Sequence, residues 1–146
     1  AALEALCVYL AKEMARDGEG ATKLVEISVT GAASEEDAAG LVRLLSISYL
    51  VKTAIHGADP NWGRIVSAVG RSDAAFDEAD VTVTLCGHRV FEQQRPTEAD
   101  PAAVSESMKG DTVTIDISLG RGPGKATGWT CDLSREYVTI NADYHT

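Results

Sequence analysis

One carboxylate of this sequence stands between two glycines, in residues 17–23 (DGEGATK). Glycines free the backbone on both sides of Glu19 to adopt unusual angles, so that its side chain can be aimed at a ligand. A glutamate held in this way is suited to pairing with a substrate ammonium group or to proton transfer. The pattern is equally typical of a glycine that ends a helix, with a solvated Glu19 beside it, and this segment alone does not decide.

A second segment, residues 56–64 (HGADPNWGR), gathers residue types that often serve in functional sites. Asp59 followed by Pro60 is typical of a helix start, with the aspartate as N-cap and the proline in the first helical position. Trp62 and Arg64 are then expected on the first turn, facing either a pocket or packing and solvent. The sequence offers the histidine of this segment no partner, so a structural role is its simpler interpretation.

Two further segments are weaker candidates. Residues 120–125 are glycine-rich but match no phosphate-binding spacing, which favours a tight connection between antiparallel strands. In the tail, the amide of Asn141 and the hydroxyl of Thr146 are able to bind a carboxylate-bearing ligand, unless the terminus frays. The sequence contains no G-x-S-x-G or comparable signature of a complete nucleophile–base pair.

Composition argues against several functional classes. The chain has 146 residues and a net charge of −9. Nucleic acid and anionic membranes are therefore not expected as partners, because both are bound through basic surfaces. No apolar run approaches the roughly 20 residues that span a bilayer, and the N-terminus does not resemble a signal peptide. Three scattered cysteines without a C-x-x-C pair indicate neither a zinc site nor a disulfide framework.

Hydrophobic periodicity predicts the elements that position these segments. Helices are expected over residues 1–16, from the N-cap Ser34 to about 46, over 60–70 and over 101–109, and strands over 22–30, 81–85, 89–92, 111–119, 126–133 and 137–144. The helix after Ser34 is expected to bury Ala38, Leu41, Val42 and Leu45. The strands over 81–85 and 89–92 are expected to form a β-hairpin. Residues 48–55 fit either a helix end or a short strand. Because the order lacks regular β-α-β alternation, we predict an α+β fold with a mixed, largely antiparallel sheet and covering helices. Residues 1–146 are expected to form a single compact unit.

The first helix has an unusual beginning. Apolar residues recur at helical spacing from the start of the chain, and no capping residue precedes them. Natural domains rarely begin inside an uncapped helix. We therefore expect the chain to be a piece of a larger protein.

Taken together, these segments resemble one family, the ornithine acetyltransferases (glutamate N-acetyltransferases). The matching segments are DGEGATK (17–23), VKTAIHGADPNWGRI (51–65), the glycine turn leading into CDLS (131–134), YVTINADY (137–144) and the final Thr146. They occur in the same order in the family, and the resemblance runs over residues 1–146, with minor departures at Gly128, Thr130 and Ser134. It implies the ornithine acetyltransferase/DmpA-like fold and the C-terminal portion of a β chain.

The resemblance also implies a chemistry. In this family a precursor cleaves itself before a threonine, which becomes the N-terminal nucleophile of the β chain. The threonine takes the acetyl group from N2-acetyl-L-ornithine and passes it to L-glutamate. That nucleophile is expected upstream, so this chain supplies no catalytic residue. It is expected to supply the substrate-binding residues Glu19, which pairs with the α-ammonium group, Asn141 and Thr146.

The family further implies a cytoplasmic enzyme of arginine biosynthesis that needs no metal or other cofactor. Its partners are expected to be the α chain and the rest of the β chain of the same precursor, in an α2β2 heterotetramer. The small-molecule substrates are N-acetylornithine and glutamate, and the use of acetyl-CoA stays open. Two other functions also stay open: a threonine-nucleophile aminopeptidase or amidase of similar fold, and a non-catalytic binding module.

Overall fold

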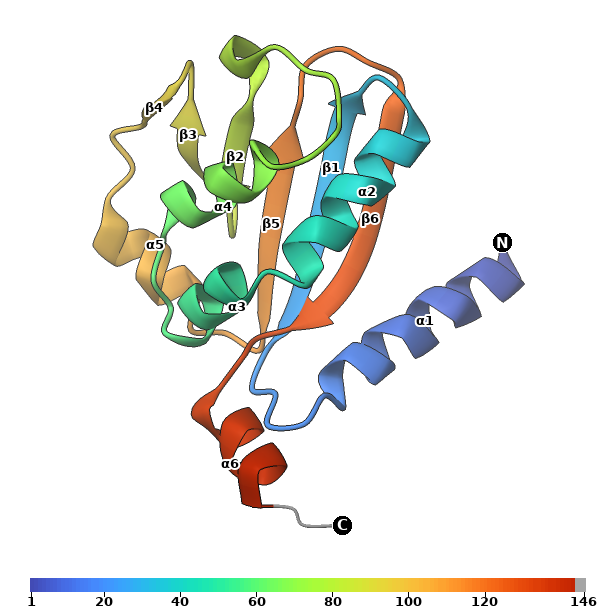
Figure 1. The fold of residues 1–146 in the computed structure, drawn as a ribbon, viewed down its shortest axis with the longest axis vertical. Coiled ribbons are helices and arrows are strands. Elements are labelled where there is room, and N and C mark those ends of the chain that lie inside the picture. The colour runs from blue at the N-terminus through green and yellow to red at the C-terminus, as the bar shows by residue number, and fades with distance from the viewer. Residues whose placement is uncertain (144–146) are drawn as a thin grey trace.

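A single six-stranded sheet organises the chain, for which a computed structural model describes residues 1–143 (Figure 1). The strands are β1 (Leu24–Ala32), β2 (Thr82–Leu85), β3 (His88–Glu92), β4 (Arg95–Pro96), β5 (Thr112–Ser118) and β6 (Gly124–Cys131). Their order across the sheet is β4-β3-β2-β5-β1-β6, and only β1 and β5 pair in parallel. The predicted α+β fold with a mixed, largely antiparallel sheet is confirmed.

The two faces of the sheet differ in polarity. On β1, alternate residues Val25, Ile27 and Val29 are buried in the core. Ile27 lies in register with Ile115 of β5 on one side and with Gly128 of β6 on the other. Because successive side chains of a strand point to opposite faces, the residues between them form the other, more polar face.

Three helices cover the apolar face (Figure 1): α2 (Glu35–Ser46), α3 (Tyr49–His56) and α4 (Trp62–Val69). As predicted, the Ser34 hydroxyl accepts a hydrogen bond from the backbone N–H of Asp37 and caps α2. Helix α2 buries the four residues expected from its periodicity, Ala38, Leu41, Val42 and Leu45. The remaining helices are α1 (Ala2–Arg16), the short 3₁₀ turn η1 (Glu78–Asp80), α5 (Pro101–Ser107) and α6 (Arg135–Asp143).

The prediction of a strand over residues 137–144 is wrong, because this segment lies in α6 as far as Asp143. Its apolar residues imitate strand alternation, but the edge strand β6 ends at Cys131 and the chain turns away from the sheet. Two side chains instead bond to the backbone one helical turn earlier: Thr139 Oγ1 to Arg135 O, and Asn141 Nδ2 to Tyr137 O. Without a neighbouring strand, local hydrogen bonding favours the helix.

The predicted start of α4 is also wrong, by two residues. Asn61, not Asp59, is the N-cap, since its Oδ1 accepts the backbone N–H of Arg64. Asp59 supports this cap by accepting a hydrogen bond from Asn61 Nδ2 at 3.0 Å. Pro60 therefore precedes the helix. The undecided residues 48–55 belong to helix α3, which is capped by Ser48.

The two predicted turns have different outcomes. The β2–β3 hairpin is confirmed, and its Cys86-Gly87 turn has positive φ at both residues, as a tight turn between twisted antiparallel strands requires. Residues 120–125 do connect strands of opposite direction, but β1 lies between β5 and β6. The connection is therefore a crossover, and not a hairpin.

Within residues 1–143, no single helix is long and apolar enough to cross a membrane. Only α2 and α3 pass such a test by length and composition when taken together, and they are bent by 61° relative to each other.

Candidate functional site

Two of the three predicted site residues lie in contact at the end of the molecule formed by α6 and the loop after α1 (Figure 1). Asn141 Nδ2 donates a hydrogen bond to Glu19 Oε2 at 2.7 Å, across 122 residues of sequence. Both side chains are exposed. The third predicted residue, Thr146, lies outside the described residues.

Close backbone packing holds residues 17–23, here called the Glu19 loop, against α6. Gly20 has a φ of +67°, and a Cβ atom at this position would lie 2.6 Å from the backbone nitrogen of Tyr137. The buried Ser134 donates from Oγ to the carbonyl oxygen of Gly20 at 2.6 Å. The glycine that follows Glu19 is thus required by both its conformation and its close approach to α6.

A buried carboxylate anchors the other end of this loop. The side chain of Asp132, one residue after β6, is 0% exposed. Its Oδ1 accepts the backbone N–H groups of Thr22 at 2.7 Å and Lys23 at 2.9 Å. Its Oδ2 accepts the Thr22 hydroxyl and lies 2.7 Å from Nδ1 of His56. One carboxylate therefore joins the Glu19 loop, the end of α3 and the end of β6.

The electrostatics of Asp132 agree with this role. Burial raises the pKa of its carboxyl, but hydrogen bonds from Thr22, His56 and the backbone N–H of Lys23 outweigh burial and lower the pKa below its ordinary value. The carboxylate of Asp132 is therefore ionised at neutral pH, and it holds the Glu19 loop through hydrogen bonds.

The Thr22, His56 and Asp132 side chains do not form a nucleophile–base relay. In such a relay the histidine contacts nucleophile and carboxylate through different ring nitrogens. Here Nδ1 of His56 faces both partners, and the Thr22 hydroxyl donates to Asp132. The sequence offered His56 no partner, because its partner lies 76 residues away in a segment without a nucleophile or metal signature.

The rest of the HGADPNWGR segment has structural contacts. Trp62 stacks on Phe91 with ring centroids 5.2 Å apart. Arg64 Nη1 donates to the carbonyl oxygen of Leu50 at 2.8 Å and to Thr53 Oγ1 at 3.2 Å, which ties α4 to α3. Both residues therefore have packing contacts, and Trp62 also lines a small cavity of about 150 Å³ beside α5. Neither residue lies in the Glu19–Asn141 contact.

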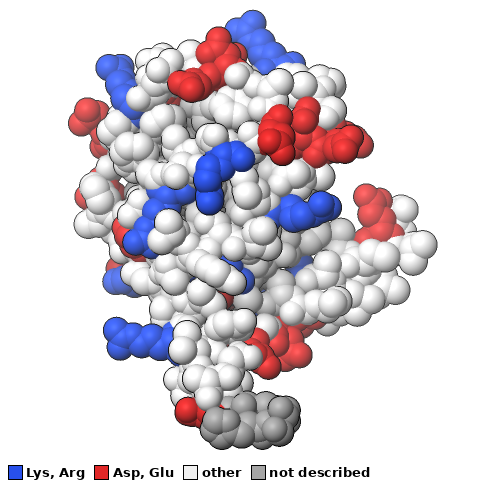
Figure 2. Space-filling view, in the orientation of Figure 1, with Lys and Arg blue, Asp and Glu red and all other residues white. Residues whose placement is uncertain are grey.

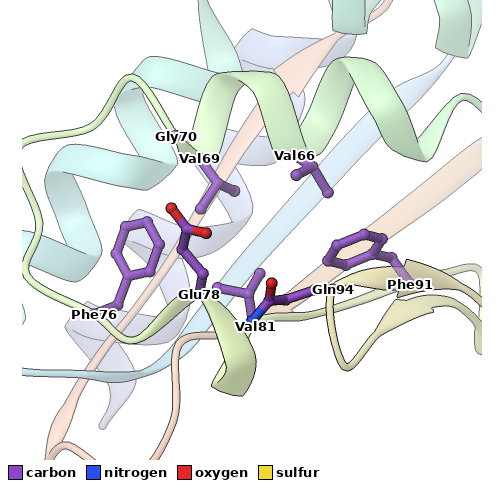
Figure 3. Close-up of a pocket in the computed structure, with 8 residues that line it drawn as sticks. All are labelled: Val66, Val69, Gly70, Phe76, Glu78, Val81, Phe91 and Gln94. Atoms are coloured by element: carbon purple, nitrogen blue, oxygen red, sulfur yellow. The ribbon is translucent and has the colours of Figure 1, made fainter.

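A separate pocket lies between α4, the segment that leads into β2, and the end of β3 with the turn after it (Figure 3). It has a volume of about 430 Å³ and is lined by Val66, Val69, Gly70, Phe76, Glu78, Val81, Phe91 and Gln94. Its walls are largely apolar and contain neither Glu19 nor Asn141. Within residues 1–143, no three His, Cys, Asp or Glu side chains are grouped so as to hold a metal ion.

Comparison with known proteins gives a consistent result over the whole chain. The family model described as the ArgJ family matches residues 1–146. The arginine biosynthesis bifunctional protein ArgJ of Deinococcus radiodurans is 52% identical over 145 residues, which cover 99% of this chain and 37% of that protein. The ArgJ protein of Parasynechococcus marenigrum is 51% identical over 138 residues, 94% of this chain and 34% of that protein.

A solved structure agrees in three dimensions. The crystal structure of the arginine biosynthesis bifunctional protein ArgJ from Bacillus halodurans superposes with a TM-score of 0.94 at 42% identity, covering 98% of this chain and 68% of that chain. The chain thus spans little more than a third of the length of its curated relatives. The resemblance stated from the sequence is confirmed: the chain belongs to the ArgJ family.

Proposed function

We propose that this chain is part of an acyltransferase that moves an acetyl group from N2-acetyl-L-ornithine to L-glutamate through an acyl-threonine intermediate. The chain supplies substrate-binding residues, and the nucleophilic threonine lies in another part of the protein. The observation that carries the proposal is the contact between Glu19 and Asn141, the two described residues to which the family resemblance assigns substrate binding.

The chemistry of the contact suits an amino-acid ligand. Glu19 is an exposed carboxylate on a loop that is fixed at both ends, by Gly20 against α6 and by Asp132. A fixed carboxylate recognises an ammonium group with little loss of conformational entropy on binding. Both substrates of the proposed reaction are amino acids or their acetylated derivatives, and glutamate and the ornithine product each carry an α-ammonium group.

Asn141 has a defined share in this recognition. Its amide nitrogen donates to Glu19 Oε2 and to the carbonyl oxygen of Tyr137 at 2.9 Å, so both amide hydrogens are engaged. Its Oδ1 accepts no hydrogen bond among the described residues. We therefore assign Asn141 two tasks: it orients Glu19, and its Oδ1 offers a second acceptor for the substrate ammonium group.

The remaining expectations complete the proposal. Autocatalytic cleavage of a precursor generates the threonine nucleophile, and the α chain with the rest of the β chain completes an α2β2 heterotetramer in the cytoplasm. This chain, as the C-terminal portion of the β chain, contributes one side of the substrate site. Thr146 stays a prediction from the family resemblance as a third substrate contact.

A chimera tests the assignment of Glu19. In this chimera, the 145 matched residues of the Deinococcus radiodurans ArgJ protein are replaced by this chain, and the rest of that protein is kept. We expect Glu19→Ala to reduce acetyl transfer from N-acetylornithine to glutamate on the order of 100-fold, because the substrate loses its positioning contact. Glu36→Ala, which removes another exposed carboxylate on α2, serves as the matched control and should leave the rate unchanged. Undiminished transfer by a folded Glu19→Ala chimera would refute the assignment.

A further inference from the structure

Helix α1 carries an apolar stripe that its own fold does not cover. Leu3, Leu6, Leu10 and Met14 are 49 to 78% exposed, and no residue of α1 is buried. Their spacing of three and four residues places them on one side of the helix. In Figure 2 the surface of α1 turned to the viewer has few charged side chains, whereas acidic and basic groups are interspersed over the rest of this face.

The opposite side of α1 is the one that contacts the sheet. Lys12 Nζ lies 2.9 Å from Glu26 Oε2 and 5.4 Å from the ring centroid of Trp129. Trp129 Nε1 donates to the same carboxylate at 2.7 Å. Helix α1 is therefore held by polar groups on one side, while its apolar stripe faces away from the molecule.

Exposure of the stripe leaves α1 without the apolar packing that normally stabilises a helix. A helix of 15 residues is only marginally stable in water unless an apolar face is packed against something. A continuous row of exposed leucines is also rare on the surface of a soluble monomer and is typical of an interaction site. The stripe therefore requires a second surface.

We infer that the stripe binds the polypeptide that makes up the remaining length of ArgJ proteins. This inference rests on the proposed function and adds the surface through which the chain joins the rest of the enzyme. The matched region is 37% of the Deinococcus radiodurans protein and 68% of the Bacillus halodurans chain, so a large further polypeptide is present in each of these relatives. An apolar stripe with few charges requires an apolar groove on that polypeptide.

The position of α1 gives the interface a consequence for the substrate site. The helix ends at Arg16, and only Asp17 and Gly18 separate it from Glu19. Gly18 packs so closely that an added Cβ would lie 2.7 Å from Sγ of Cys131. The connection between α1 and Glu19 is therefore short and tightly packed. When the stripe of α1 binds the rest of the protein, it also fixes the position of the Glu19 loop relative to that polypeptide.

Amide hydrogen exchange across α1 tests the inference in two contexts, the chain alone and the chimera with the Deinococcus radiodurans protein. We expect exchange over residues 2–16 to be at least tenfold slower in the chimera. The double variant Leu6→Gln/Leu10→Gln, which keeps good helix formers and the net charge, should remove most of this protection. The matched control is Ala5→Gln, on the same helix but outside the stripe, and it should retain the protection. Equal exchange in both contexts, or equal effects of the two variants, would overturn the inference.

Two further measurements do not depend on the folding of the chimera. Co-expression of the tagged chain with the unmatched part of the Deinococcus radiodurans protein should yield a complex that the double variant weakens at least tenfold; a complex that survives the double variant counts against the stripe. Light scattering of the chain alone tests a second copy as the occupant. Dimers that the double variant dissociates would overturn the inference in favour of self-association. None of these three measurements depends on acetyl transfer. A chimera that does not transfer acetyl groups, but in which α1 is protected from hydrogen exchange, would therefore count against the proposed function and support the interface.

Discussion

Helices α1 and α2 both lie beside strand β6, but they relate to the sheet in different ways. Helix α2 begins at a serine cap and places four residues in the core. Helix α1 has no side-chain cap and no buried residue, and a salt bridge with a cation–π contact holds it to the sheet. The apolar residues of α2 stabilise this fold, whereas those of α1 are available to a partner. The end of the molecule that carries Glu19 and Asn141 shares the exposed character of α1.

The largest expected effect separates the two helices directly. Leu41→Ala on α2 should reduce the free energy of unfolding by about 3 kcal/mol, because Leu41 is fully buried and its loss leaves a cavity. Leu10→Ala on α1 should change it by less than about 0.5 kcal/mol in the isolated chain. Urea denaturation followed by circular dichroism measures both. Similar losses in the two variants would mean that α1 packs within this chain.

The next effect concerns the clamp beneath the Glu19 loop. Asp132→Asn should reduce the free energy of unfolding by about 2 kcal/mol at pH 7, because the neutral amide replaces a buried acceptor of charge-assisted hydrogen bonds. Glu36→Asn, at an exposed position of α2, is a suitable control and should have little effect. Denaturation at pH 7 distinguishes the two.

The effect of Asp132→Asn should depend on pH. The pKa of Asp132 is lowered in the folded chain, so its carboxylate contributes stability that is complete above the unfolded value of about 4. That contribution is lost as the pH falls through the lower, folded-state pKa. The difference between wild type and variant should therefore shrink as the pH falls below about 4. A difference that grows over this acidic range would contradict the direction of the shift.

A smaller effect is expected from the glycine that follows Glu19. Gly20→Ala should destabilise the chain by about 1 to 2 kcal/mol, because φ is positive and the new methyl group meets the backbone of Tyr137. Gly40→Ala on α2 should instead stabilise it by about 0.5 to 1 kcal/mol, since no atom lies within 4 Å of the added Cβ and alanine favours a helix. Thermal unfolding of both variants compares the site loop with a covering helix, and the same sign for both would be evidence against the packing described for Gly20.

The smallest change in stability is expected at the contact between Glu19 and Asn141, which carries the proposed function. Asn141→Ala should alter the free energy of unfolding by less than about 0.5 kcal/mol, because the side chains of Asn141 and Glu19 are exposed. In the chimera the same change should raise the KM for glutamate, since Glu19 loses the amide that orients it. Steady-state kinetics with glutamate as the varied substrate provides the measurement, and an unchanged KM would remove Asn141 from the proposed site.

Much of the fold was predictable from the sequence because it depends on local patterns. Alternation in β1 and β5, the Ser34 cap and the Cys86-Gly87 turn each depend on a few neighbouring residues. The start of α4 was misplaced because two capping residues, Asp59 and Asn61, stand two positions apart and only their hydrogen bonds distinguish them. Segment α6 was mistaken for a strand because alternation alone does not say whether a neighbouring strand exists.

The candidate site likewise has features that the sequence predicted and features that only the tertiary structure showed. The sequence by itself identified Glu19 between its glycines and, through the family resemblance, Asn141, because residue type and spacing are properties of the chain. Only the tertiary structure decided that Asn141 donates a hydrogen bond to Glu19 from 122 residues away, and that Asp132 accepts hydrogen bonds from the loop and provides His56 with a partner. It also decided that the stripe of α1 faces outward. These features depend on which distant segments pack together, and that is set by burial of the whole core and not by any local pattern.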